Sequence, residues 1–448
     1  MVACFAAAWA SLAVPAFLGY DPWVWVLWGR EATRGLPVSD GTIAWKPLPV
    51  LVTPVLALFG DAAPQLWLVL ARAVGLFGLV LLFRLAARYA GPLAGAVAVG
   101  AFLLTPDAES RWLRHLLQGN IEPVTVALAL WAADRHLAGR PGQALVLLGA
   151  AGLTRPEVWP LLLLYAGWTV VREPRRWWQA AIVLAAVPVL WFGGDRLVSG
   201  DALGGAGVAQ VLDGSTVSRL VLALDNVAVA VILPVWVAAA AGLVWAAHRR
   251  LPGPPVLAAA AFVWTAEVVV MAGWLGYAAL GRFLAPVSAV LCLLAGVAVG
   301  WAAALPRPVV ARVAVALVLV AAAVPAALPR VGWLPAQVAA AGHRAAYEAD
   351  LDRMVAVLGG RDRMPACGGL ALDLARPAVE FRPALAWKLD VPLARVRHSL
   401  DNGPGLTLAQ AGTTLDRRLA TLPPAEATLV ARNDRWAAYA QQCGTSLR

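Results

Sequence analysis

Long apolar runs recur along the first three-quarters of this chain of 448 residues, and they constrain its fold more than any other feature. Most of these runs approach the roughly 17–25 residues that a helix needs to cross a bilayer. Charged residues make up 14% of the chain, against about 25% in soluble globular proteins. The sequence therefore predicts an all-α, polytopic membrane protein.

Eleven of the runs are candidate membrane spans. They cover approximately 2–19, 65–83, 92–106, 119–133, 142–153, 157–171, 177–194, 219–247, 255–275, 285–304 and 308–328. The two shortest, 142–153 and 157–171, could instead form a hairpin that does not cross fully, which leaves the parity of the count unchanged. We therefore expect a transmembrane domain over residues 1–328.

The polar remainder, 329–448, alternates helix-like stretches with strand-like ones at Gly369–Leu374, Ala427–Val430 and Ala437–Ala440. This alternation predicts a small α/β domain. Cys367 and Cys443 lie in this part of the chain and could form a disulfide in an oxidising exterior, although a pair of reduced thiols fits equally well. Cys4 and Cys292 fall within apolar runs, where cysteine behaves as a small hydrophobic residue.

The loops between the runs alternate in charge, which predicts their sidedness. One set is short and basic, as cytoplasmic loops are; it carries Arg84 and Arg88, Arg135 and Arg140, Arg172, Arg175 and Arg176, Arg249 and Arg250, and Arg307. The longer loops of mixed charge, 20–64, 107–118, 195–218 and 276–284, face outward. An odd number of spans then places the C-terminal domain outside the cytoplasm too. Because the arginines are scattered at the ends of apolar runs, the net charge of +10 does not indicate a nucleic-acid partner.

Ionisable residues gather on the outward side. They are Asp21, Lys46, Asp107, Glu109, Arg155 and Arg282, together with Arg72, Asp225 and Glu267 inside the outer parts of apolar runs. Charged groups at membrane depth are costly unless they line a cavity or pair with one another. The pattern therefore predicts one polar cavity that opens outward.

A cavity with a carboxylate and several cations suits the transfer of a group from a phosphate leaving group. The carboxylate can take the proton of an attacking hydroxyl, and arginine or lysine can stabilise the departing phosphate. No nucleotide pool exists on the outer face of a bacterial membrane. The activated sugar expected there is carried on a polyprenyl phosphate, whose lipid enters from the bilayer.

The order of these elements over residues 1–328 resembles the GT-C superfamily of glycosyltransferases that use lipid-linked sugars, such as protein O-mannosyltransferases and aminoarabinose transferases. The matching elements are Asp21 after the first run, the stretch from Lys46-Pro47-Leu48-Pro49 to Phe59-Gly60, Arg72 in the next run, the acidic loop with Asp107 and Glu109, and Arg282-Phe283-Leu284-Ala285-Pro286, which is similar to the family's Arg-Tyr-x-x-Pro. Two departures stand out: Pro22 follows Asp21 where the family often has a second acidic residue, and Phe283 replaces the tyrosine.

The resemblance implies an inverting transfer of sugar from a polyprenyl phosphate to a glycan, lipid or protein acceptor outside the cytoplasm. Asp21 would be the catalytic base, and Asp107 or Glu109 would assist it or hold the acceptor. By the same resemblance Lys46 and Arg282 would bind the donor phosphate. From their positions on the outer side, we expect Arg155 to bind the phosphate with them, and Arg72, Asp225 and Glu267 to line the cavity. The carboxylates do not decide whether a divalent metal is needed, and we expect no other cofactor; the five histidines show no metal-ligand spacing.

Simpler structural roles compete with these assignments. Asp21-Pro22 is typical of a helix start, with aspartate at the N-cap, and Thr154 to Glu157 fits a capping box. Asp107 and Glu109 could be solvated, Arg282 could anchor lipid headgroups, and Glu267 could pair with an arginine. At the level of the whole protein, the alternatives are a transporter or lipid flippase, or a non-enzymatic partner of other cell-envelope proteins.

Overall fold

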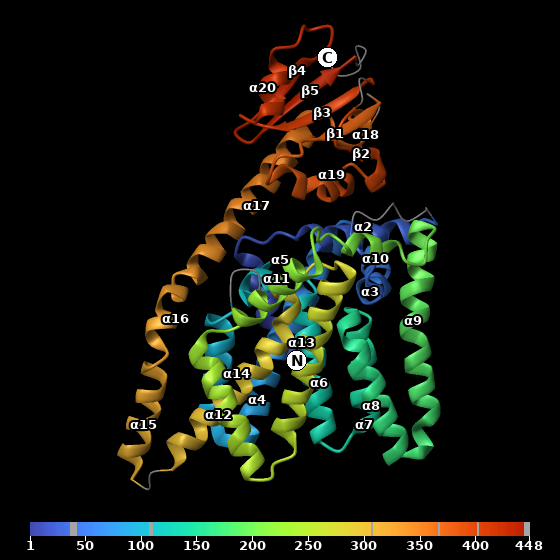
Figure 1. The fold of residues 1–448 in the computed structure, drawn as a ribbon. Helices are drawn as coiled ribbons and strands as arrows, with labels where there is room; N and C mark the ends of the chain where they lie inside the picture. Colours follow the sequence, from blue (N-terminus) through green and yellow to red (C-terminus); the bar gives the residue numbers. More distant parts are fainter. Residues whose placement is uncertain (36–42, 107–110, 306–307, 366–367, 401–402, 443–448) are drawn as a thin grey trace. The chain divides into compact units, whose positions relative to one another are not determined.

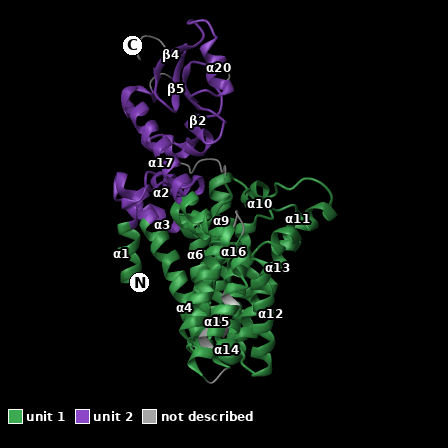
Figure 2. Ribbon diagram, turned by 90° about the vertical axis from the view of Figure 1, so that its left-hand side faces the viewer, with its two compact units in different colours: residues 1–10, 43–49, 69–337 green, residues 11–42, 50–68, 338–448 purple. Residues whose placement is uncertain are grey.

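The computed structural model describes residues 1–35, 43–106, 111–305, 308–365, 368–400 and 403–442. The chain divides into two compact units, drawn in separate colours in Figure 2. The first unit contains residues 1–10, 43–49 and 69–337. The second contains residues 11–42, 50–68 and 338–448, so it combines the C-terminal domain with two segments from early in the sequence.

The first unit is built from helices, most of which run side by side (Figure 1). They are α1 (Val2–Ala10), α5 (Trp112–Gln118), α6 (Glu122–Leu137), α7 (Pro141–Gly152), α8 (Trp159–Arg172), α9 (Trp177–Ser199), α10 (Gly204–Ala209), α11 (Thr216–Ala228), α12 (Leu233–His248), α13 (Gly253–Leu275), α14 (Ala285–Ala304), α15 (Val309–Ala321) and α16 (Val324–Val331). Three further helices have residues in both units: α3 (Pro47–Ala57), α4 (Ala63–Leu104) and α17 (Trp333–Val357).

Helix α14 lies in the largest apolar core of this unit. Its glycines let neighbouring backbones approach closely: a Cβ built at Gly296 would lie 2.4 Å from the carbonyl oxygen of Ala94, and one at Gly300 would lie 2.6 Å from that of Ala90. Small residues four positions apart are a common means of packing helices within membranes. The Gly296–Gly300 spacing therefore explains how α4 packs directly against α14.

Four helical segments are long and apolar enough to cross a membrane: Gly60–Leu104, Pro174–Ser199, Gly253–Leu275 and Gly281–Ala304. A fifth crossing is possible if α11 and α12, which are bent by 78° at their junction, count as one span. These numbers refer to the described residues. The chain is a multi-pass membrane protein, but the predicted count of eleven spans is not confirmed.

Two of the predicted runs differ from the observed helices. The run 2–19 is not one helix, because α1 ends at Ala10 and only a 3₁₀ turn follows, at Ser11–Ala13. The run 219–247 is broken between α11 and α12, and Pro234 stands in the first turn of α12. Proline lacks an N–H group and disfavours helical conformation in the residue before it. Proline thus explains the break at Pro234, and Pro15 similarly prevents the first run from continuing.

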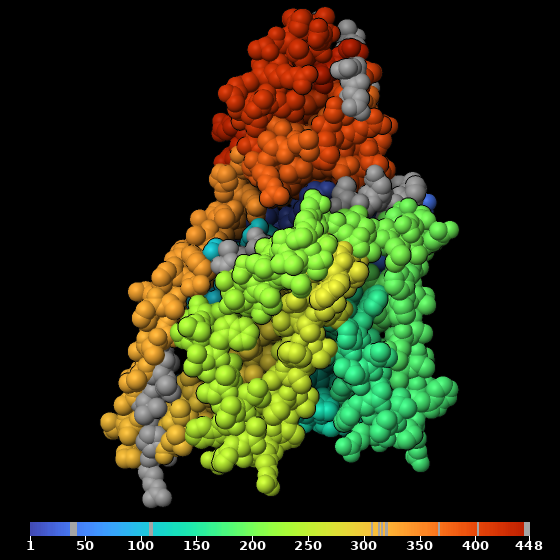
Figure 3. All heavy atoms as spheres, in the orientation of Figure 1, coloured from blue at the N-terminus to red at the C-terminus, as the bar shows by residue number. Residues whose placement is uncertain are grey.

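The outer surface of the helical unit is apolar. Figure 3 shows atoms of α8, α9, α12 and α13 on the face that is drawn. Large hydrophobic residues are exposed on these helices, among them Leu163, Ile182, Val189, Val237 and Phe262. Helices that are apolar on their outer faces are stable in lipid, where every backbone polar group is satisfied within the helix.

The second unit contains a five-stranded mixed sheet, as predicted for the C-terminal domain. Its strands are β1 (Gly369–Leu372), β2 (Val396–Arg397), β3 (Gly405–Gln410), β4 (Thr428–Arg432) and β5 (Trp436–Gln441), in the order β2-β1-β3-β5-β4. β1 pairs in parallel with β2 and β3, whereas β5 pairs antiparallel with β3 and β4. The helices of this unit are α2 (Tyr20–Thr33), α18 (Gly360–Arg363), α19 (Arg382–Lys388) and α20 (Thr414–Ala420).

Helix α2 is fixed to the C-terminal part of the second unit through Arg30. The buried guanidinium donates hydrogen bonds to the carbonyl oxygens of Trp387 (3.0 Å) and Val391 (2.9 Å). It also forms an ion pair with Asp390 at 3.0 Å and lies 4.7 Å from the centre of the Trp387 ring. Burial lowers the pKa of Arg30 to about 10, which leaves it charged at neutral pH. These contacts hold the helix that carries Asp21.

Asp416 makes the C-terminal domain sensitive to acid. Burial disfavours its ionised form, but hydrogen bonds from Tyr439, the Gly412 amide and Arg432 outweigh burial and lower the pKa of the carboxyl group. The stabilisation is therefore present above the unfolded-state pKa of about 3.9 and is lost as the pH falls through the lower folded-state value. We expect amide hydrogen exchange in α20 and β5 to accelerate as the pH falls below about 4, after correction for intrinsic exchange. The Asp416→Asn protein should lose this acid dependence, and equal dependence in both proteins would contradict the assignment.

Candidate functional site

Five polar side chains from four segments of the first unit form a charged cluster, defined here as His115, Glu122, Arg155, Glu157 and Arg282. His115 lies in α5 and Glu122 is the first residue of α6. Arg155 precedes a 3₁₀ turn at Pro156–Val158 that contains Glu157, and Arg282 lies in the 3₁₀ turn that leads into α14. Helix starts and irregular turns thus bring together residues that are 167 positions apart in the sequence (115 to 282).

Glu122 is the centre of the cluster. Its Oε1 accepts a hydrogen bond from Arg155 Nη2 at 2.6 Å and lies 3.6 Å from Arg282 Nε. Its Oε2 lies 3.6 Å from His115 Nδ1. The side chain is only 4% exposed. A single buried carboxylate therefore orients two guanidinium groups at once.

Arg155 has most of its charge compensated within the protein. Besides Glu122, its guanidinium contacts Glu157 Oε1 at 3.5 Å and lies 4.2 Å from the centre of the Phe283 ring. The Arg155 side chain is 6% exposed. The predicted capping box at this point is wrong: Arg155 is the N-cap residue of the turn, and the Thr154 hydroxyl donates to the carbonyl oxygen of Ala151.

Arg282 is the more accessible cation. Its side chain is 29% exposed, against 6% for Arg155, and its contact with Glu122 is longer. The Arg282 guanidinium lies 5.7 Å from the centre of the Phe283 ring. Of the two arginines, Arg282 is therefore the better placed to exchange part of its contacts for an anionic ligand.

Glu267 adds a further carboxylate beside the cluster. It lies in α13, half-buried, and its charge interacts with that of Glu157. In the described part of the chain, Oε2 of each glutamate is buried without a hydrogen-bond partner. The expected pairing of Glu267 with an arginine is not seen there; its charged neighbour is an acid.

Removing the carboxylate of a buried ion pair in the charged cluster should destabilise the protein much more than removing that of an exposed pair. Glu122→Leu leaves Arg155 buried without its closest carboxylate, a change that typically costs about 3–5 kcal/mol. Glu173→Leu is the matched control, because Glu173 pairs with Arg176 where both side chains are 41% exposed, and such pairs contribute about 1 kcal/mol or less. We expect a clear fall in the unfolding midpoint of the detergent-solubilised protein for Glu122→Leu alone. Equal midpoints for the two variants would contradict this description of the cluster.

Lys46 lies on a segment that runs beside the approach to Arg155. The backbone N–H of Leu48 donates to the carbonyl oxygen of Leu153 at 3.0 Å. The Trp45 indole N–H donates to the carbonyl oxygen of Leu190 at 3.0 Å, which fixes the same segment against α9. Lys46 is two positions before Leu48, and Arg155 is two positions after Leu153. The structure thus brings the two predicted phosphate-binding segments together at the level of the backbone.

The other predicted residues are placed as follows. Arg72 is buried in α4, where its guanidinium donates to the carbonyl oxygen of Leu117 at 2.8 Å and so holds the end of α5. Asp225 is exposed on α11. Asp107, Glu109, Cys367 and Cys443 lie outside the described residues. Among the described residues, no group of three or more His, Cys, Asp or Glu side chains is arranged to hold a metal ion.

Asp21 belongs to the second unit, in the first turn of α2. The predicted N-cap role is wrong, because Gly19 occupies the N-cap position and the helix starts at Tyr20. Pro22 is tolerated because the first-turn N–H groups of a helix have no intrahelical partner. A carboxylate in this turn is stabilised by the positive end of the helix dipole. Asp21 therefore lies inside the first turn of α2, and not at the N-cap position as predicted.

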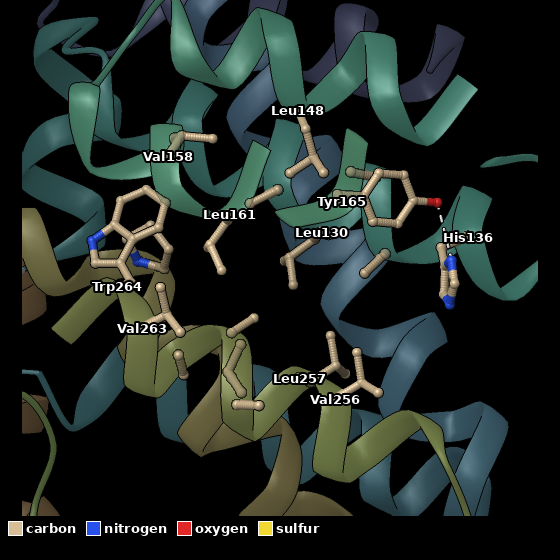
Figure 4. A pocket seen from close by; sticks show the side chains of 18 of the residues that line it. Leu130, His136, Leu148, Val158, Leu161, Tyr165, Val256, Leu257, Val263 and Trp264 are labelled. Carbon is tan, nitrogen blue, oxygen red and sulfur yellow. Dashed lines mark hydrogen bonds between the residues drawn. The ribbon is translucent and has the colours of Figure 1, made fainter. Parts of the chain in front are cut away.

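An apolar cavity of about 450 Å³ lies beside the charged cluster, between α6, α8, α13 and α14. Figure 4 shows Val158 and Trp264 at one end of it, and His136 and Tyr165 at the other. Val158 directly follows Glu157, and the Trp264 indole donates to the carbonyl oxygen of Phe283 at 2.9 Å. One end of the cavity therefore adjoins the residues that surround Arg155 and Arg282.

No protein-family model and no curated protein matches the sequence. Solved structures do match. ArnT from Cupriavidus metallidurans bound to undecaprenyl phosphate is 19% identical with a TM-score of 0.59, over 100% of this chain and 98% of the ArnT chain. ArnT from the same organism in the apo state gives the same identity and TM-score over 98% and 96% of the two chains.

The chain has the same fold as ArnT. The fold that the order of Asp21, Lys46, Arg72 and Arg282 implied is thereby confirmed. The similarity also extends further than predicted, because the ArnT fold covers the C-terminal domain, which the sequence alone related to no family.

Sequence reasoning missed the central role of Glu122 and the parts of His115 and Glu157 within this ArnT-like fold. Glu122 follows a short polar stretch and precedes Pro123 at the start of an apolar run, which reads as an ordinary helix start. The available signal was its position on the predicted outer side, in the same layer as Arg155 and Arg282. That signal gives depth in the membrane but not the direction in which a helix turns its side chain.

Proposed function

We propose that this protein is an integral-membrane glycosyltransferase that moves a sugar from a polyprenyl-phosphate donor to an acceptor outside the cytoplasm. One observation carries the proposal: the partly exposed Arg282, oriented by the buried Glu122, lies where a charged cluster adjoins an apolar cavity. A lipid phosphate presents the complementary pair of groups, an anion attached to a hydrocarbon chain. The ArnT structure with bound undecaprenyl phosphate shares this fold and supports the proposal.

The donor phosphate is assigned to Arg282, Arg155 and Lys46. Arg282 is the leading ligand because it has the greater exposure, and guanidinium groups bind phosphate in a bidentate way. Arg155 contributes a second positive charge that two carboxylates already hold in place. Lys46 adds an ammonium group from the neighbouring segment. Together they stabilise the negative charge that develops on the leaving phosphate.

Asp21 is assigned as the general base, and Asp107 or Glu109 as the residue that assists it or holds the acceptor. An acceptor hydroxyl oxygen attacks the anomeric carbon, and its proton passes to the carboxylate. The bond between that carbon and the phosphate oxygen breaks, and polyprenyl phosphate leaves with the bonding electrons. Direct displacement inverts the configuration at the anomeric carbon. The acceptor is a glycan, lipid or protein of the cell envelope, and the charge pattern of the loops supports a site outside the cytoplasm.

The apolar cavity is assigned to the part of the isoprenoid chain next to the phosphate. Several of its lining side chains are partly exposed, including Leu164, Trp168 and Val256, so a longer chain can continue into the surrounding lipid. Burying the first isoprene units would supply hydrophobic binding energy and bring the phosphate to the cluster.

Undecaprenyl phosphate binding tests this assignment. Leu161→Trp fills the cavity, whereas Leu163→Trp is the matched control, because Leu163 is 61% exposed and does not line it. We expect Leu161→Trp to weaken binding of undecaprenyl phosphate to the purified protein at least about tenfold, equivalent to roughly 1.4 kcal/mol, and Leu163→Trp to leave it unchanged. Native mass spectrometry of lipid titrations measures both. Unchanged binding by a folded Leu161→Trp protein would show that the chain lies elsewhere.

A further inference from the structure

The C-terminal domain contains a second cavity, whose walls are more polar than those of the apolar cavity between α6, α8, α13 and α14. Its volume is about 310 Å³, at the lower end of the roughly 300–1,000 Å³ of small-ligand sites. It lies between one face of the sheet, helix α20 and the segment that follows β2. All of its lining residues belong to the second unit.

The strand register explains how this cavity forms. Ala371 on β1 is the register partner of Thr407 on β3, so both side chains lie on the same face of the sheet. Gly405, two residues before Thr407 and so on the same face, pairs with Gln441 on β5, which places Gln441 on that face too. The small side chain of Ala371 leaves space beside them. Helix α20 covers the same face through Leu415 and Leu419, which close the far side of the cavity.

Neutral hydrogen-bonding groups dominate the walls. Thr407 donates its hydroxyl to Gln441 Oε1 at 2.7 Å, which turns the amide nitrogen of Gln441 away from Thr407. Ser399, Gln442 and His398 also line the cavity. Burial lowers the pKa of His398, so its ring is neutral near pH 7. In the described part of the chain, His398 Nδ1 is buried without a hydrogen-bond partner, although the ring bonds to the Leu372 backbone.

The charged residues of the cavity balance each other. Arg418 and Glu426 are both exposed at its edge, one positive and one negative, and they are the ionised side chains among the described residues of the lining. A site for a phosphate or a cation would carry an excess of one sign. Hydroxyl, amide and imidazole groups on one side and leucine side chains on the other match a molecule with many hydroxyl groups and apolar C–H faces.

We propose that this cavity binds a neutral saccharide unit of the acceptor. The existence of the site is independent of the transferase chemistry, whereas the identification of the saccharide as acceptor rests on the proposed function. A C-terminal saccharide site would hold one part of a glycan acceptor while another part reacts. Binding at this cavity therefore raises the affinity for glycan acceptors without contributing to the chemical step.

Saturation-transfer NMR on the full-length protein in detergent tests the site, with the methyl glycosides of mannose, glucose, galactose and arabinose as probes. We expect saturable binding of at least one probe. His398→Phe, which keeps the ring but removes its nitrogens, and Arg418→Ala should each weaken that binding at least fivefold. Arg417→Ala is the matched control: Arg417 is the exposed neighbour of Arg418 on α20, does not line the cavity, and should bind the probe normally.

Absence of binding to every probe would overturn the proposal, and so would binding that none of the lining substitutions weakens. A variant that loses β5 protection in hydrogen exchange is replaced in the comparison by the other lining variant. The two proposals can fail separately. Saccharide binding by a protein that transfers no sugar would preserve this site and refute the transferase, whereas sugar transfer with no saccharide binding would do the reverse.

Discussion

The Asp21→Asn protein is expected to fold normally and to transfer sugar at least about a hundredfold more slowly than the unchanged protein, because a general base contributes roughly 10²–10⁴ to the rate. Asparagine has the same size as aspartate and cannot accept the proton. The helix itself should persist, since Arg30 still binds it to the carbonyl oxygens of Trp387 and Val391 in the C-terminal part. Initial rates with saturating donor measure the effect.

Asp61→Asn is the matched control for Asp21→Asn. Asp61 lies in the same unit, is exposed, and pairs at the surface with Arg361 at 2.8 Å. It should transfer sugar at the normal rate. If a folded Asp21→Asn protein also transferred sugar at the normal rate, Asp21 would not be the base, and its place in the first turn of α2 would be purely structural.

Arg282→Ala is expected to lower the rate of transfer about 10²–10³-fold, the range found when one donor to a developing negative charge is removed. Arg282→Lys should recover part of this loss, because lysine keeps the charge but not the planar pair of donors. The loss should appear in kcat as well as in the KM for the donor, since the charge on the phosphate increases as the bond to the sugar breaks.

Arg249→Ala serves as the control for Arg282→Ala. Arg249 follows α12 and is exposed in a loop that the charge pattern assigns to the cytoplasm. We expect no change in kcat or KM for this variant. A normal kcat in Arg282→Ala, with or without a change in KM, would refute the assignment of Arg282 to the leaving phosphate.

The sequence predicted the fold class because the absence of charge in long runs is a strong physical constraint. It located helix boundaries less well where proline intervenes, as at Pro15 and Pro234. In the C-terminal domain it predicted strands that correspond to β1, β4 and β5. It missed β3, Gly405–Gln410, because glycine and alanine, which strands disfavour, weaken the signal of this six-residue strand.

The candidate site was predicted in outline only. Sequence order suggested Lys46, Arg155 and Arg282, and the structure places the last two around one carboxylate. The sequence alone could not identify that carboxylate, because Glu122, Glu157 and Glu267 all lie near the outer ends of apolar runs. Which of them meets an arginine depends on helix rotation and on the 3₁₀ turns at Pro156–Val158 and Gly281–Leu284. Neither is encoded in the hydropathy pattern that revealed the helices.

One measurement tests the central proposal most directly: incubation of the purified protein in proteoliposomes with a panel of labelled polyprenyl-phosphate sugars and cell-envelope acceptors. The proposed function predicts that one donor yields glycosylated acceptor and polyprenyl phosphate in equal amounts, and that nucleotide sugars yield neither. Uptake of a labelled solute into the vesicles, with no sugar transferred from any donor of the panel, would contradict it and favour a transporter.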